Sequence, residues 1–258
     1  MPELPRVWPD EGRDIVLNGK PLAIDLFAGV GGFTEGLMAE GFECVGFDIE
    51  RHDYGDGKRY PAQLVIQDVL TIRGSQFKDA ELIVASPPCQ EFAYLAMPWS
   101  RGKQIAAALR GKGEFPEGYK GSRTIKEMTA LFDACFRIQR EAIQAAGHFI
   151  PMVVENVRGA QPWVGRAQAH FGSFYLWGDV PALMPIKLHA PKMGPSPGKL
   201  WSDRPPSVAA HREGTDFKKR QPDDGKGARF TSRKAASAMI AKIPMPLSTW
   251  IAKTYRPK

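Results

Sequence analysis

The chain has 258 residues, 43% of them hydrophobic and 24% charged, enough to bury the core of one large domain or of one domain with a small lobe. The first twenty residues mix acidic side chains with prolines, so we expect no signal peptide, and no apolar run approaches the roughly 20 residues that a membrane span needs. The net charge is +7, and two segments carry it: residues 94–123 hold 6 basic against 2 acidic side chains, and residues 187–234 hold 12 against 5. These segments indicate a polyanion-binding face, with solvated loops as the alternative.

Strand and helix signals alternate from residue 22 onward. Leu22–Phe27 is an apolar run that predicts a buried strand, residues 28–32 form a glycine-rich turn, and Thr34–Glu40 predicts a helix closed by Gly41. Further apolar runs predict strands at 44–47, 64–66, 82–85 and 151–154. The apolar spacing over residues 124–146 predicts an amphipathic helix. This alternation predicts an α/β fold with a parallel sheet.

The composition changes near Pro185, where the chain becomes rich in proline, glycine and charge. We therefore expect a main domain over residues 1–184 and a small irregular basic lobe over residues 185–230. Residues 231–258 are expected to return to the main domain, with a helical stretch that Pro244 and Pro246 interrupt.

The glycine-rich turn predicts a nucleoside site. Glycines let the backbone approach a ligand, and the N-terminus of the following helix offers free N–H groups. Asp48 ends the next predicted strand, where a carboxylate can bind two ribose hydroxyls. The chain has no Gly-Lys-Ser/Thr sequence, which argues against a nucleoside-triphosphate loop.

Pro87-Pro88-Cys89-Gln90 directly follows the strand predicted at 82–85. The two prolines fix the local backbone, so Cys89 is presented rigidly where an α/β sheet usually binds its ligands. It is a candidate nucleophile, with an inert buried thiol as the alternative. The other cysteines, Cys44 and Cys135, are too far apart for a disulfide framework or a zinc site, which indicates a reducing compartment.

Three motifs in series resemble the cytosine-C5 DNA methyltransferases: Phe27–Phe33, Pro87–Gln90 and Glu155-Asn156-Val157. The resemblance covers residues 20–160 well and residues 228–256 more loosely. It implies a Rossmann-like methyltransferase fold, S-adenosylmethionine as the cofactor and duplex DNA as the partner. The implied cofactor-binding residues are Asp25, Phe27, Gly29, Gly31, Gly32, Phe33, Asp48, Ile49, Asp68 and Pro88.

In that family the matching cysteine is the nucleophile, so the resemblance assigns Cys89 to attack C6 of cytosine. The addition makes C5 nucleophilic enough to take a methyl group from a sulfonium. Glu155 is implied to engage N3 and must hold a proton at some stage. Asn156 is expected to orient Glu155 or the Cys89 loop, whereas a capping or loop pair is the alternative for these two residues.

The target cytosine must leave the base stack for this chemistry, so the resemblance implies base flipping. The basic, glycine-rich stretch after Cys89 is expected to be a mobile cationic loop that closes over DNA. Gln90, Arg101, Lys103 and Arg166 are the expected DNA-binding residues. The family's Gln-x-Arg-x-Arg element is missing from the strand expected at 171–178, and Arg158 and Arg166 are the nearest substitutes. Either could instead bind phosphate or form a surface ion pair.

Two further departures concern specificity and the donor. The region available for target recognition is small, which predicts a short or relaxed recognition sequence. Residues 231–236 resemble a family motif with Lys234 in place of glutamate. The family's Gly-Asn-x-Val-Pro element corresponds to residues 240–244, where the asparagine is lost and Lys242 adds a cation beside the expected methionine end of the donor. Lys242 therefore pairs the donor carboxylate, faces solvent, or accepts a donor with an extra carboxylate.

The sequence thus favours a monomeric, metal-free DNA cytosine-C5 methyltransferase of the cytoplasm, in a bacterium or a phage-infected cell. An RNA cytosine methyltransferase shares the same chemistry and is the main alternative. A DNA-binding module with a degenerate catalytic fold and a small-molecule methyltransferase are further alternatives. The intact Cys89 and Glu155 argue against the first of these, and the basic segments argue against the second.

Overall fold

The structure is a computed structural model that describes residues 19–52, 59–92, 98–182 and 241–257. Within them, seven strands form one sheet in the order β3-β2-β1-β4-β5-β7-β6. The first five are mutually parallel: β1 (Leu22–Leu26), β2 (Glu43–Asp48), β3 (Gln63–Ile66), β4 (Leu82–Ala85) and β5 (Met152–Asn156). The α/β class predicted from the sequence is confirmed, and the arrangement is Rossmann-like. The basic lobe expected at 185–230 lies outside the described residues.

The sheet ends in an antiparallel pair that the sequence did not predict as two strands. β7 (Phe174–Gly178) runs antiparallel to β5, and β6 (Ala169–Phe171) pairs with β7. The single strand expected at 171–178 is wrong, because Gly172 has φ 59° and the chain turns there. A positive φ is cheap for glycine and breaks the extended run.

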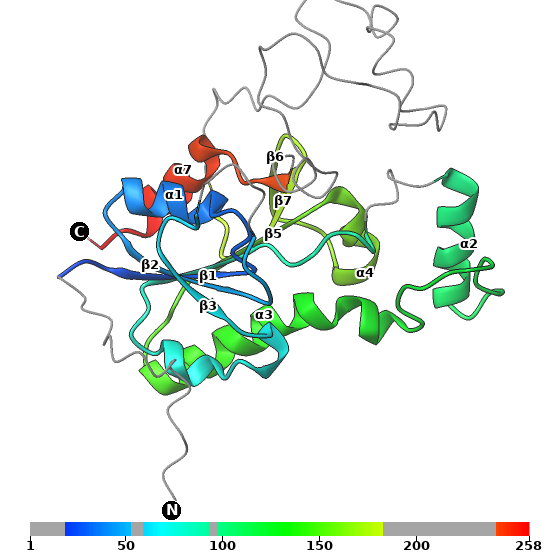
Figure 1. Cartoon of the computed structure of the whole chain (residues 1–258), viewed down its shortest axis with the longest axis horizontal. Coiled ribbons are helices and arrows are strands. Elements are labelled where there is room, and N and C mark those ends of the chain that lie inside the picture. Colours follow the sequence, from blue (N-terminus) through cyan, green and yellow to red (C-terminus); the bar gives the residue numbers. More distant parts are fainter. Residues whose placement is uncertain (1–18, 53–58, 93–97, 183–240, 258) are drawn as a thin grey trace, which may run out of the picture.

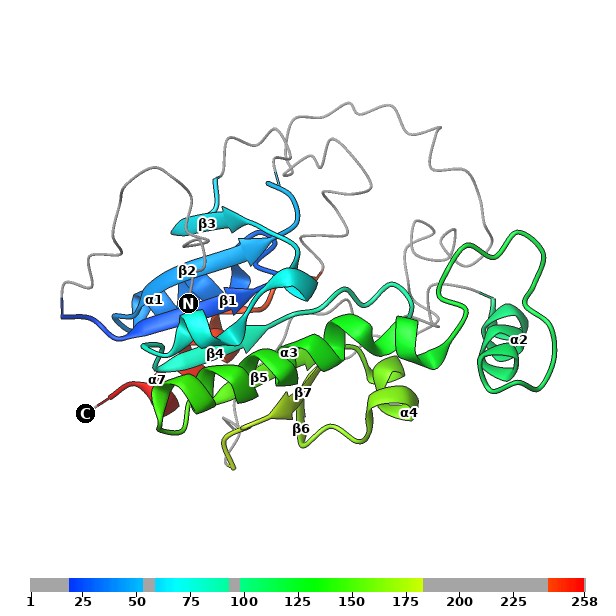
Figure 2. The same ribbon diagram turned by 90° about the horizontal axis from the view of Figure 1, so that it is seen from below.

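Helices cover both faces of the sheet (Figures 1 and 2). One face carries α1 (Gly32–Ala39) and α7 (Met245–Tyr255), with Phe33, Leu37 and Leu247 in their shared core. The other face carries α3 (Ile125–Ala146) with the short turns η1 (Val69–Thr71) and η2 (Gly74–Phe77). Because side chains alternate along a strand, β1 supplies both cores at once.

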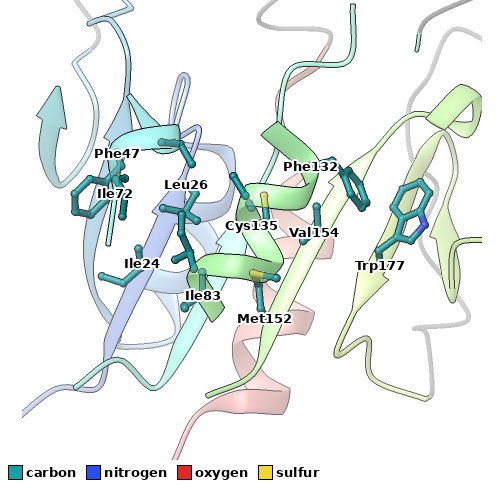
Figure 3. Close-up of a cluster of buried hydrophobic side chains, with 14 of the residues drawn as sticks. Ile24, Leu26, Phe47, Ile72, Ile83, Phe132, Cys135, Met152, Val154 and Trp177 are labelled. Carbon is teal, nitrogen blue, oxygen red and sulfur yellow. The ribbon is translucent and has the colours of Figure 1, made fainter. Parts of the chain in front are cut away.

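The core on the α3 side is the larger of the two and is shown in Figure 3. Ile24 and Leu26 of β1, Ile83 of β4 and Met152 of β5 are fully enclosed there. Burying each such side chain contributes about 1.5–3 kcal/mol relative to leaving it in water. This packing holds the carboxyl ends of the parallel strands in fixed positions relative to one another.

The amphipathic helix predicted over 124–146 is confirmed as α3. Thr124 caps it: the Thr124 hydroxyl accepts from the Glu127 N–H at 3.1 Å, and Glu127 accepts from the Thr124 N–H at 3.3 Å. Gly147 ends it with φ 73°. Phe132 and Cys135 point from its buried face into the core, where Phe132 meets Trp177 of β7 edge to face at 5.4 Å.

Residues 98–123, which we call the basic arm, differ from the loop predicted for them. Residues 99–109 form α2 (Trp99–Leu109), since the run of alanines near its end favours a helix and Ile105 and Leu109 pack into the core. Figures 1 and 2 place α2 at one end of the molecule, beyond the short helix α4 (Gln161–Val164). No helix of the described residues is long and apolar enough to cross a membrane.

Candidate active site

The carboxyl ends of β1, β2, β4 and β5 meet at one edge of the sheet because these strands are parallel. The chain reverses its direction of growth between β1 and β4, since β2 flanks β1 on one side and β4 on the other. Open α/β sheets bind ligands at such a switch point. Asp48 is the last residue of β2, Glu155 is the second to last of β5, and Cys89 follows β4 by four residues.

The glycine-rich turn has a backbone that needs its glycines. Gly29 and Gly31 have φ of 52° and 80°, and Gly31 is the N-cap of α1 without a side-chain cap. A Cβ on Gly31 would lie 2.6 Å from Pro61 Cδ, and one on Gly32 would lie 2.6 Å from the Ile243 nitrogen. A Cβ on Gly29 would meet only the Phe27 oxygen, at 3.8 Å. The turn is therefore closed against protein at Gly31 and Gly32 and open at Gly29.

Asp48 lies beside the open part of this turn. Its Oδ2 accepts a hydrogen bond from the Gly29 N–H at 2.8 Å, and its Oδ1 lies 3.3 Å from His52 Nε2. Burial by itself opposes ionisation, but His52 and the Gly29 N–H outweigh it and hold the pKa of Asp48 below its usual value. The group is thus a carboxylate at neutral pH, which suits the ribose hydroxyls of a nucleoside.

The other residues predicted for the cofactor separate into two groups. Ile49 is 69% exposed beside Asp48, Pro88 is exposed, and Asp68 caps η1 by accepting from the Leu70 N–H at 2.9 Å. By contrast, the side chains of Asp25 and Phe33 are enclosed beneath the turn, at 2% exposure each. A bound nucleoside can therefore meet Ile49 and Pro88 directly but not these two side chains.

The Cys89 loop is tied to β5 by two side chains. Asn156 donates from Nδ2 to the Pro87 carbonyl at 2.9 Å, and its Oδ1 accepts from the Val157 N–H at 2.8 Å. The Ser86 hydroxyl donates to Glu155 Oε2 at 3.1 Å. Asn156 and Glu155 are buried, at 1% and 8% exposure. The contact of Asn156 with the loop that carries Cys89 is the one its predicted orienting role requires.

Cys89 differs from the other two cysteines of the chain in its exposure. Cys44 and Cys135 are buried, whereas Cys89 is partly exposed. Burial, with the nearby carboxylates of Asp25 and Glu43, raises the pKa of Cys44 well above its ordinary value. Burial also raises the pKa of Cys135. Because the thiolate is the reactive form of cysteine, the two buried thiols are inert and Cys89 is the candidate nucleophile.

The residues predicted to bind DNA are dispersed. Gln90, Arg158 and Arg166 are exposed, and Lys103 of α2 lies 5.2 Å from the ring of Trp99. Arg101 donates to the Glu117 carbonyl at 3.3 Å and so bridges α2 to the segment that follows it. The structure does not bring Arg101 and Lys103 to the strand ends, since α2 lies beyond α4 (Figures 1 and 2).

Lys242 reaches the site from the C-terminal segment. Its ammonium pairs with Glu35 Oε1 at 2.6 Å, in the first turn of α1. The sequence predicted that Lys242 faces the donor or solvent and did not foresee this ion pair. Residues 231–236, which resemble a family motif, lie outside the described residues.

Sequence reasoning missed Ser86, His52 and Tyr60. Ser86 stands between a strand and Pro87, so its position alone could have marked it. His52 lies four residues after Asp48 and contacts the same carboxylate, a spacing that is visible in the sequence. Tyr60 had no local signal, because its partner Asp25 is 35 residues away.

The fold and these strand ends define a Rossmann-like α/β protein with a candidate nucleoside site and a candidate cysteine nucleophile. Residues 22–98 match the family model of the C-5 cytosine-specific DNA methylases. The match spans the glycine-rich turn, Asp48, Asp68 and Cys89, while Glu155 lies beyond it. Methyltransferases of that family use S-adenosylmethionine as the methyl donor.

No curated protein matches the chain. Among solved structures, it is similar to the S. pombe Dnmt2 methyltransferase, with 16% identity and a TM-score of 0.33 over 57% of this chain and 37% of that one. It is also similar to the Entamoeba histolytica methyltransferase EhMeth, with 16% identity and a TM-score of 0.34 over 57% of this chain and 41% of that one. The aligned part thus spans about two fifths of these relatives.

Proposed function

We propose that this protein transfers a methyl group from S-adenosylmethionine to C5 of cytosine in DNA through a covalent adduct between Cys89 and C6. One observation carries the proposal: hydrogen bonds from Ser86 to Glu155 and from Asn156 to the Pro87 carbonyl tie the loop of the partly exposed Cys89 to the strand end of the buried Glu155. They lie at the edge that holds the glycine-rich turn and Asp48. The family match over residues 22–98 supports the same reaction.

The residues of the donor side fit S-adenosylmethionine. Asp48 would bind the ribose hydroxyls, Ile49 would pack on the base and the open backbone at Gly29 would approach the nucleoside. When bound, the donor supplies an electrophilic methyl group on a sulfonium. Lys242 is already neutralised by Glu35, which favours the ordinary donor over one with an additional carboxylate.

On the substrate side, the Cys89 thiolate adds its electron pair to C6, and the electrons of the C5–C6 bond become available at C5. A proton held by Glu155 at N3 neutralises the charge that this addition places on the ring. After C5 has taken the methyl group, loss of the C5 proton and breaking of the sulfur–C6 bond restore the ring and the thiolate. For these steps the Ser86 hydroxyl orients Glu155, and Asn156 holds the Cys89 loop through the Pro87 carbonyl.

The charge favours a nucleic acid as the substrate, and the family match favours DNA. The basic arm carries six cations, and Cys89 can reach C6 only if the cytosine is flipped out of the duplex. Arg158, exposed directly after β5, is the residue we assign to contact the flipped base or its phosphate. We further propose a short or relaxed recognition sequence, because the basic lobe expected at 185–230 is small for base readout.

The reaction is tested with a duplex that contains 5-fluorocytosine, since fluorine at C5 cannot leave as a proton and the adduct stays covalent. Wild-type protein with S-adenosylmethionine should form a denaturation-resistant complex, and Cys89→Ala should form none. The same sequence as structured RNA should trap far less protein. Equal or preferential trapping on RNA would replace DNA with RNA as the substrate, and no trapping on either would refute the adduct.

The product and its sequence context are read from the same reaction with ordinary cytosine. Mass spectrometry of the bases should find 5-methylcytosine alone, whichever donor is supplied. Base-resolution sequencing should find modification at sites defined by fewer than four base pairs. Confinement to one longer site would contradict the relaxed specificity but leave the chemistry intact.

A further inference from the structure

A buried polar network lies directly beneath the glycine-rich turn, and the proposed reaction makes no use of it. Asp25 of β1 is 2% exposed, and its Oδ2 accepts hydrogen bonds from the Thr34 hydroxyl at 2.7 Å and from the Tyr60 hydroxyl at 3.4 Å. The Thr34 and Tyr60 hydroxyls also contact each other. Two hydroxyl groups, one from α1 and one from the segment before β3, thus converge on one carboxyl group of β1.

The surroundings of Tyr60 are shaped to admit its hydroxyl. Any Cβ on Gly46 of β2 would overlap the Tyr60 hydroxyl and ring, so glycine is required there for the tyrosine to enter. Tyr60 and Pro61 also border Gly31, at 3.4 and 2.6 Å from the position of a Cβ. Residues 60–61 therefore lie against the turn while the Tyr60 hydroxyl enters the network.

The network touches both ends of the donor-binding segment. Asp25 stands two residues before Phe27, which has φ 60° and is the only residue other than glycine with positive φ in the described part of the chain. Thr34 stands two residues after Gly32, in the first helical turns of α1. Strained backbone of this kind persists only where the surrounding structure over-determines it. The Asp25–Thr34–Tyr60 network supplies that restraint.

We propose that Tyr60 is a positioning residue for the methyl donor: through Asp25 and Thr34 it holds residues 27–32 in the conformation that receives the nucleoside. The inference rests on the proposed function, because it presumes that S-adenosylmethionine binds this turn. The hydrogen bonds of the Tyr60 hydroxyl go to Asp25 and Thr34, beneath the glycine-rich turn, so we expect its effect to fall on the donor. A turn that is not held must be ordered at the moment of binding, which weakens affinity.

The test compares Tyr60→Phe with Tyr255→Phe. Tyr255 lies in the last turn of α7, away from the glycine-rich turn, and its hydroxyl donates to the Asp179 carbonyl in a partly buried contact that Tyr255→Phe removes. Donor affinity by calorimetry, KM for donor, kcat and the melting temperature are measured for both and for wild type. We expect Tyr60→Phe to raise the donor Kd and KM by about five- to tenfold with kcat at saturating donor within twofold of wild type. Tyr255→Phe should lower the melting temperature and leave donor affinity within twofold.

A second pair of variants separates positioning from general stability. Thr34→Val keeps the side-chain shape and should give the same rise in KM, and the double variant should be no worse than either single one, because the residues act as a unit. Wild-type affinity retained in Tyr60→Phe, or equal losses in Tyr60→Phe and Tyr255→Phe, would overturn the inference alone. A wild-type protein that does not bind S-adenosylmethionine would overturn the proposed function and this inference with it.

Discussion

The donor side and the substrate side of this site are built in different ways. On the donor side, residues 22–49, the key contacts join residues close in the chain: Gly29 with Asp48, 19 residues apart, and Asp25 with Thr34, 9 apart. On the substrate side, Ser86 meets Glu155 and Pro87 meets Asn156 across 69 residues each. Local contacts order at little entropic cost, whereas distant ones need the whole sheet. The two sides should therefore respond separately to mutation.

The sharpest separation is expected for Cys89→Ala. Turnover should fall by at least about a thousandfold, because the nucleophile is lost, while donor affinity stays unchanged. Cys135→Ala, at a fully buried thiol of α3, is the matched control and should keep its activity within a fewfold range. Methyl transfer to duplex DNA and calorimetric donor binding check both variants. Activity in Cys89→Ala would show that Cys89 is not the nucleophile, and it would contradict the division of the site into a donor side and a substrate side.

The next largest effect is expected on the pH dependence of the stability of the fold, which the buried carboxyl group of Asp25 influences. Burial raises its pKa from 3.8 to about 7, against the opposing hydrogen bonds from Thr34 and Tyr60, with a small contribution from the charge of Asp48. The folded protein thus keeps a proton that the unfolded chain releases, so stability falls as pH rises from about 4 to 7 and is level above that. The rise in pKa corresponds to about 4 kcal/mol.

Asp25→Asn removes this titration. The stability of the variant relative to wild type should therefore increase as pH rises from about 4 to 7. Urea unfolding of both proteins between pH 4 and pH 8 measures the difference between their free energies of unfolding. In this difference the contributions from the titration of all other groups cancel. Parallel stability profiles for the two proteins would show that the Asp25 carboxyl group does not hold its proton in the folded state.

Asp48→Ala should weaken S-adenosylmethionine binding by about a hundredfold, since it removes the carboxylate that we propose accepts hydrogen bonds from the two ribose hydroxyls. The affinity for DNA should change little, which sharpens the contrast between the two sides. Asp79→Ala, an exposed carboxylate after η2, serves as the control. A comparable loss of DNA affinity in Asp48→Ala would mean that the donor side is not autonomous.

Asn156→Ala should lower kcat by about tenfold at saturating donor and DNA. It removes the hydrogen bond to the Pro87 carbonyl and leaves that buried acceptor without its donor. Donor affinity should be unaffected, because the side-chain hydrogen bonds of Asn156 are made with Pro87 and Val157 rather than with the glycine-rich turn. Steady-state kinetics with each substrate varied in turn tests this, and a rise in the donor KM with normal kcat would contradict it.

The smallest effect is expected on the basic arm. Lys103→Ala should weaken DNA binding severalfold and reduce the slope of log affinity against log salt by about one, as for one lost phosphate contact. Lys78→Ala, an exposed cation next to η2 beneath the sheet, should leave the slope unchanged. Identical slopes for wild type and Lys103→Ala would remove this residue from the DNA interface.

Sequence patterns predicted the parallel strands and α3 well, and residues 98–123 and 169–178 poorly, for a physical reason. The strands at 22–26, 43–48 and 82–85, and α3 with its Thr124 cap, follow from periodicity and capping, which are local. α2 was taken for a loop because Gly102 and the surrounding glycines hide a helix whose stability comes from Ile105 and Leu109 in the core. The turn at Gly172 divided a strand that had no interruption in its apolar pattern.

By itself, the sequence determined the α/β class, the glycine-rich turn, Asp48 as a strand-end carboxylate and a proline-held Cys89, because each depends on residue types at short spacing. Only the tertiary structure decided that Asn156 and Ser86 join the Cys89 loop to β5, that Lys242 pairs with Glu35, and that Asp25 is enclosed with Thr34 and Tyr60 beneath the turn. Apart from the pair Asp25 and Thr34, these contacts join residues that are distant in the chain, and only the packing of helices on the two faces of the sheet brings them together.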